Sequence, residues 1–187
     1  MCGRYTFQSD FSPEISQITR LAQANGYEIK TGEVFPGDTT AVVIADQGKI
    51  KVVGMAWGFP IFGNKRLLIN ARSETLLEKR TFSESFKKRR CVYPTTGFFE
   101  WNLDKEKVWF NYADHHEALY IAGCYNFFDG QARSVLFTTE PNQSVAPVHN
   151  RMPLILKKTQ IAAWLSDFNA ASEMIANPMP ELFSKKV

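Results

Sequence analysis

Cysteine is scarce in this chain, which has only Cys2, Cys91 and Cys124. The count is odd and no two of them form a CxxC pair, which argues against a disulfide framework and against a zinc site. We therefore expect no metal and no cofactor, and this cysteine usage favours a reducing, cytoplasmic compartment. Cys91 and Cys124 fall in apolar segments and are predicted to be core residues.

Long apolar runs are missing as well. No stretch of about 18 apolar residues indicates a membrane span, and the first residues lack the charged-then-apolar pattern of a secretory leader. The 187 residues show no repeat, low-complexity tract or interdomain linker, and their 44% hydrophobic content is enough for a core. We expect a single domain over residues 1–187, and a monomer.

The net charge of +3 says little about a nucleic-acid partner. The placement of charge is more informative, because residues 87–90 read Lys-Lys-Arg-Arg. Such a cationic run is typical of a solvated helix end, and it indicates nucleic-acid binding only if a groove lies beside it.

The pattern of elements predicts an α+β fold. Ser12 before Pro13 is a typical helix start, and Gly26 can end that helix. Further helical segments are predicted at 73–80, 82–88 and 161–168, and residues 58–64 are interpreted as a loop. About eight or nine short strands are expected, mostly joined by hairpins. The segments considered for them are 4–7, 41–45, 50–57, 67–70, 91–93, 98–101, 108–112, 119–127, 134–139 and 154–156. They favour mostly antiparallel sheets, packed or closed into a barrel-like core, with several peripheral helices.

Cys2 has the most distinctive chemistry in the chain. An initiator methionine before so small a residue is usually removed, which leaves an α-amine and a thiol on one residue. The amine can condense with an aldehyde to an imine, and the thiol can then close a five-membered thiazolidine ring. Unperturbed pKa values of about 7.7–8.0 and about 8.5 leave both groups partly available near neutral pH. The alternative is a frayed terminus in which Cys2 has no role.

Three other polar residues stand in unusual surroundings. Asn70 ends an apolar segment, Glu100 lies within Gly-Phe-Phe-Glu-Trp, and His149 precedes Asn-Arg-Met-Pro. A carboxyl group in an apolar site has a raised pKa, as a general acid requires. Strand alternation leaves Glu100 open to two interpretations, because it lies on the face opposite Phe99 and Trp101, and that face can be buried or exposed. His149 can equally be an ordinary loop histidine.

Six segments together carry a family resemblance. They are 1–5 (MCGRY), 57–58 (WG), 70–75 (NARSET), 89–94 (RRCVYP), 97–101 (GFFEW) and 149–153 (HNRMP). In these segments and their order the chain resembles the SOS-response-associated peptidase family, whose members shield abasic sites in single-stranded DNA. The loop after Trp57-Gly58 departs from the family, because many relatives have a longer loop with a second tryptophan there.

The resemblance implies a function in the DNA damage response, with nucleoid association in a bacterium. Mature Cys2 would cross-link to the aldehyde of an abasic site through a thiazolidine, with Asn70, Glu100 and His149 around it. The positions implied to contact DNA are Arg4, Trp57, Arg72, Arg80 and Arg151. Two alternatives stay open at this point: a thiol peptidase or autopeptidase that uses Cys2, and a non-catalytic module that binds single-stranded DNA.

Overall fold

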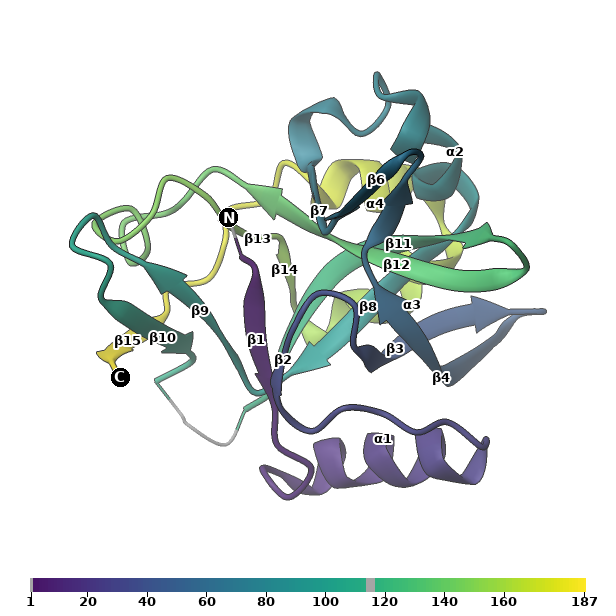
Figure 1. The fold of residues 1–187 in the computed structure, drawn as a ribbon, viewed down its shortest axis with the longest axis horizontal. Helices are drawn as coiled ribbons and strands as arrows, with labels where there is room; N and C mark the ends of the chain where they lie inside the picture. Colours follow the sequence, from purple (N-terminus) through teal and green to yellow (C-terminus); the bar gives the residue numbers. More distant parts are fainter. Residues whose placement is uncertain (1, 114–116) are drawn as a thin grey trace.

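The larger sheet closes on itself (Figure 1). In this computed structural model, which describes residues 2–113 and 117–187, five strands pair around a ring. In ring order they are β4 (Lys49–Trp57), β3 (Thr39–Asp46), β8 (Arg90–Thr95), β11 (Leu119–Phe128) and β12 (Gln131–Thr139). The β12 strand pairs with both β11 and β4, the latter in parallel, and so completes the barrel. The expected α+β fold with a barrel-like core is confirmed.

The second sheet has five antiparallel strands and packs against the barrel. Their order is β15 (Phe183–Lys186), β10 (Lys107–Asn111), β9 (Gly97–Trp101), β1 (Arg4–Phe7) and β2 (Gly32–Val34). Tyr5, Phe98 and Phe110 are fully buried on its inner face. The Tyr5 ring lies 5.2 Å from that of Trp57 of β4, so the two sheets share one aromatic core.

The structure has more short strands than the sequence predicted. Residues 58–64 were predicted as a loop, but β5 (Phe59–Ile61) and β6 (Asn64–Leu68) form a hairpin there. β7 (Asn70–Arg72) runs parallel to β12, while β13 (Met152–Pro153) and β14 (Ile155–Leu156) pair with β12 and β11. The described residues hold fifteen strands, so the expected eight or nine was too few.

The first helix and the one predicted at 82–88 agree with the structure, and the other two differ. In α1 (Pro13–Ala24) the Ile15 N–H donates to the Ser12 side chain, and Gly26 follows with φ of +80°. The predicted helix at 73–80 is wrong: Ser73–Thr75 is a 3₁₀ turn, and α2 spans Arg80–Lys88. The C-terminal helix divides into α3 (Ile161–Ser166) and α4 (Phe168–Met174) because Asp167 caps the second. None of the described helices is long and apolar enough to cross a membrane.

Arg90, the last residue of the cationic run, is buried rather than part of a charged groove. Its guanidinium donates to the carbonyls of Phe86 and Lys87 at the end of α2, and to those of Trp164 and Leu165 in α3. Carbonyls in the last turn of a helix lack intrahelical partners and carry partial negative charge. Arg90 therefore joins the ends of two helices to β8.

We expect Arg90→Met to lower the free energy of unfolding by about 3 kcal/mol, because several charged hydrogen bonds are lost and their acceptors stay buried. Urea titration measures the loss. The matched control is Lys87→Met in the same run, whose exposed side chain leaves stability within about 0.5 kcal/mol. Equal losses in the two variants would contradict this role for Arg90.

Candidate active site

Cys2 lies just before β1 and is fully buried, so it is not a frayed terminal residue. Its Sγ is 3.7 Å from the Arg4 carbonyl oxygen, to which the thiol donates. Burial raises the pKa of the thiol far above its usual value, and the nearby Glu100 carboxyl raises it further. The thiol is therefore protonated at neutral pH in this environment.

Asn70 holds the backbone of Cys2. Its Nδ2 donates to the Cys2 carbonyl at 3.0 Å, while its buried Oδ1 has no hydrogen-bond partner among the described residues. The strand that carries Asn70 is fixed at Ile69, whose carbonyl accepts from the Trp57 indole at 2.9 Å and the Leu136 N–H at 3.1 Å. Asn70 thus offers one acceptor to a further donor beside Cys2.

Glu100 faces the interior from β9, with 2% of its surface exposed. This decides between the two interpretations of its strand face, because Phe99 and Trp101 lie on the other side. Burial raises the pKa of Glu100 to about 7. A carboxyl group with that pKa can both give and take a proton near neutral pH.

His149 lies against this carboxyl group. Its Nε2 is 3.8 Å from Glu100 Oε2, and its Nδ1 accepts the Arg151 N–H at 3.1 Å. Nδ1 also lies 3.2 Å from the Arg151 carbonyl oxygen. When Nδ1 accepts the N–H, the proton of the neutral ring is on Nε2, the nitrogen that faces Glu100. Burial lowers the pKa of His149, which favours that neutral form. The structure therefore brings together all four predicted catalytic residues, from four distant parts of the chain.

The arginines predicted to contact DNA differ in the exposure of their side chains and in the contacts that hold them. Arg72 and Arg80 are exposed, at the end of β7 and the start of α2. The Arg4 guanidinium lies 4.2 Å from the ring centre of Phe35 and pairs with Glu33 at 3.4 Å.

Arg151 is held more firmly than the other three. Its side chain is 12% exposed, and its two terminal nitrogens bind the Glu74 carboxylate at 2.7 and 2.8 Å. One of them also donates to the Thr138 carbonyl at 2.8 Å. Glu74 lies within the segment 70–75 that carried the family resemblance, but the sequence assigned it no role. The ion pair with Arg151 is visible only in the folded chain.

Trp57 does not present its ring to the surface. Its side chain is fully buried, and the indole N–H is bound to Ile69. The ring offers no exposed surface in this structure, and its contact with DNA stays a prediction. Its role in the site is to support β7 and, through it, Asn70.

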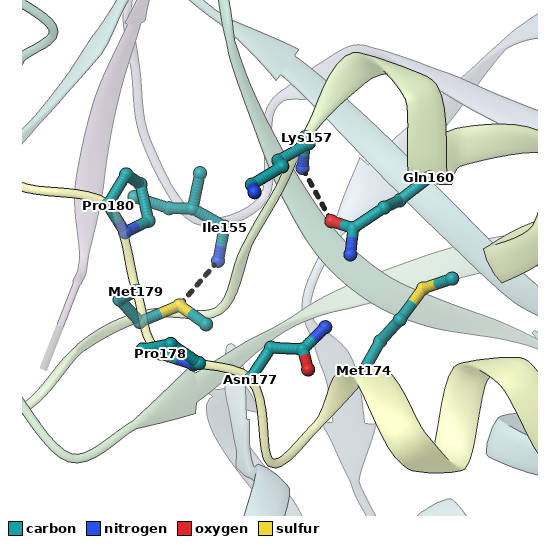
Figure 2. Close-up of a pocket in the computed structure, with 8 residues that line it drawn as sticks. All are labelled: Ile155, Lys157, Gln160, Met174, Asn177, Pro178, Met179 and Pro180. Atoms are coloured by element: carbon teal, nitrogen blue, oxygen red, sulfur yellow. Dashed lines mark hydrogen bonds between the residues drawn. The ribbon is translucent and has the colours of Figure 1, made fainter.

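One cavity of about 380 Å³ lies apart from these residues (Figure 2). Its walls already bond to each other: the Ile155 N–H donates to Met179 Sδ and the Lys157 N–H to Gln160 Oε1. Lys157 is among the described residues that line it, but no acid, histidine or cysteine is, so Lys157 has no ionisable partner there. In the part of the chain that the structure describes, no cluster of three or more metal-ligating side chains occurs either.

Comparison with known proteins finds relatives that match most of this chain. Abasic site processing protein YoaM of Bacillus subtilis is 30% identical, over 94% of this chain and 83% of its own length. Abasic site processing protein YedK of Escherichia coli is 26% identical, over 88% of this chain and 79% of its own length. A solved structure from Bordetella bronchiseptica has the same fold, with a TM-score of 0.80 at 20% identity, covering 100% of this chain and 99% of that one.

A family model also matches almost the entire sequence. Its description is SOS response associated peptidase (SRAP), and the match covers residues 1–186. The chain therefore belongs to the SOS response associated peptidase family.

Proposed function

We propose that this protein processes abasic sites in single-stranded DNA by linking Cys2 covalently to the sugar aldehyde. The observation that carries the proposal is the site itself: Cys2 is held by Asn70 beside the Glu100–His149 pair. An N-terminal aminothiol, a spare acceptor and an acid–base pair suit condensation with an aldehyde. Relatives named abasic site processing proteins support a role at abasic sites.

The reaction needs the minor, open form of the abasic sugar. In ring opening the C1′–O4′ bond breaks: His149 donates its Nε2 proton to O4′ and takes back the proton that the C1′ hydroxyl loses as it becomes the aldehyde. The Cys2 amine then adds to C1′, and Glu100 protonates the resulting hydroxyl, which leaves as water, after which the nitrogen returns its proton to Glu100 to give the neutral imine. Sγ adds to the C1′ of the imine, and the thiol proton goes to the nitrogen. The net change is the loss of one water, and Asn70 positions the amine throughout.

The protonation state of the Cys2 thiol determines the order of these steps. It also helps to choose between abasic-site processing and the two alternative functions. A peptidase nucleophile needs a thiolate, which an electropositive environment stabilises. The Cys2 thiol instead has a pKa raised by burial, so the amine is the better first nucleophile. A module that only binds DNA has no need of a buried acid beside its first residues, because leaving such a group inside costs stability. Abasic-site processing therefore accounts for more of the site than either alternative.

Intact-protein mass spectrometry after mixing with an abasic single strand tests the proposal. The expected species has lost Met1, which lies outside the described residues, and has gained the oligonucleotide minus one water. A strand whose abasic sugar has been reduced to an alcohol is the control, because it has no aldehyde. Active protein that retains Met1, or an equal yield with the reduced strand, would contradict the thiazolidine.

A second prediction concerns Glu74, which anchors the Arg151 side chain. The Arg151 N–H in turn fixes the His149 ring, so Glu74→Gln is expected to slow adduct formation about tenfold by loosening that ring. Stability should change little, because the Glu74 side chain is 41% exposed. Glu84→Gln, which breaks an exposed pair with Lys88 on α2, is the matched control. If the two variants cross-link at the same rate, Glu74 has no positioning role.

A further inference from the structure

The outer face of the five-stranded sheet carries a row of cations and aromatic rings. The strand register places Arg4 opposite Phe99, Phe99 opposite Trp109, and Trp109 opposite Lys185. Directly paired residues of antiparallel strands share a face. The row therefore crosses β1, β9, β10 and β15 in the order cation, ring, ring, cation. In Figure 1 these strands lie on the side of the molecule away from α2 and α4.

A second row runs beside the first, and the two are linked by contacts between charges and rings. Trp101 is paired with Lys107, whose Nζ lies 3.8 Å from the ring centre of Phe99. The Arg4 guanidinium lies 5.2 Å from the Trp101 ring. Each ring on this face thus has a cation nearby, an arrangement that suits a ligand with both flat rings and negative charge.

The middle of the face is hollow. A depression of about 340 Å³ is lined by Glu33, Phe99, Lys107, Trp109 and Lys185, among others. Glu33 pairs with both Arg4 and Lys107, so its carboxylate is neutralised, and these two cations together with Lys185 leave a positive excess among the four side chains. The Trp109 ring lies flat on β9: Gly97 has φ of +143°, and a Cβ at that position would collide with the indole.

We infer that this face binds the unpaired nucleotides on one side of the abasic site. The inference rests on the proposed function and extends it, because Arg4 links the face to Cys2 only two residues away. The Phe99 ring is buried under Lys107, but the Trp101 and Trp109 rings are partly exposed. Bases of a single strand can stack on these two rings, whereas those of a duplex are already stacked on each other. Lys107 and Lys185 then contact phosphates, which gives affinity without reading sequence.

Two neighbouring lysines of β15 provide a matched test. Lys185 pairs with Trp109 on the outer face, whereas Lys186 pairs with Val108 on the other and bonds to Glu106 at 2.7 Å. We expect Lys185→Gln to weaken binding of intact single strands severalfold and to lower the slope of log affinity against log salt by about 0.7. Lys186→Gln should leave both unchanged. Trp109→Ala should weaken binding about tenfold through lost stacking.

The measurements are fluorescence anisotropy with labelled single strands, and adduct rate at saturating abasic strand. Wild-type affinity should increase when the strand is lengthened on one side of the abasic site, and Lys185→Gln should lose part of that gain. The adduct rate of Lys186→Gln should stay within twofold of wild type. The inference is overturned if Lys185→Gln binds single strands as tightly as wild type, or if Lys185→Gln and Lys186→Gln lose the same affinity. Neither result affects the proposed function. Absence of any adduct with wild-type protein overturns the proposed function instead.

Discussion

Cys2→Ala is expected to abolish the stable adduct with abasic DNA while leaving the affinity for intact single strands within about twofold. The variant keeps its α-amine, so an imine can still form, but no thiol can close the ring. Cys2→Ser should behave in the same way, since its hydroxyl is a weaker nucleophile. Both adducts should therefore be lost on heating unless they are first trapped by borohydride. Denaturing electrophoresis with and without borohydride distinguishes these cases.

The matched control for Cys2 is Cys124→Ala. Cys124 is fully buried in β11, as was predicted from its apolar segment, and it has no part in the proposed reaction. Its replacement costs some packing energy but should leave the adduct yield of folded protein unchanged. If Cys2→Ala gives a heat-stable adduct without borohydride, another nucleophile forms the cross-link.

Glu100→Gln is expected to slow adduct formation by a factor of about 10²–10⁴, the usual contribution of general acid–base catalysis. The amide keeps the shape of the carboxyl group but cannot exchange a proton. Because a catalyst acts on both directions of a step, any reversal of the adduct should slow by a similar factor. Single-turnover rates with natural abasic DNA measure the loss. Equal rates in the variant and wild type would make Glu100 a structural residue.

The same substitution is expected to stabilise the fold at neutral and higher pH. Burial raises the pKa of Glu100 to about 7, well above the ordinary value of about 4.3. Between these values the folded state binds more protons than the unfolded state, so wild-type stability falls as the pH rises through this range. Above pH 7 the carboxylate costs about 3 kcal/mol, which the uncharged glutamine avoids.

Thermal unfolding at pH 5 and pH 8 checks this sign. Glu100→Gln should exceed wild type in melting temperature at pH 8 by several degrees, and the difference should shrink at pH 5. Glu106→Gln is the contrasting control, because bonding to Lys186 lowers the pKa of that exposed carboxyl. Its contribution to stability is present above the unfolded pKa and is lost as the pH falls. A melting temperature of Glu100→Gln below that of wild type at pH 8 would contradict the buried, costly carboxylate.

Local patterns predicted those elements whose signals lie within the element itself. Ser12 caps α1 because the donor and the acceptor of the capping bond are three residues apart. The pairing of β11 with β12 is local as well, because only an Asp-Gly turn at residues 129–130 separates the two strands. The predicted helix at 73–80 failed because β12 holds β7 in an extended conformation up to Arg72, and the chain turns before α2 begins. Strand β15 was missed because its residues are exposed and its pattern is polar, so only pairing with β10 makes it a strand.

The sequence by itself determined the chemical groups available to this protein: a thiol at position 2, a carboxyl group among aromatic residues, and a histidine close to an arginine. Those properties belong to single residues and their immediate neighbours, so they can be read along the chain. Only the tertiary structure decided which of them meet. The Asn70–Cys2 bond spans 68 positions and the Arg151–Glu74 pair spans 77, and such contacts exist only once the sheets have packed. The tertiary structure also decided that Glu100 and Trp57 are buried. A strand pattern shows which residues share a face, but it does not show which face the core will cover.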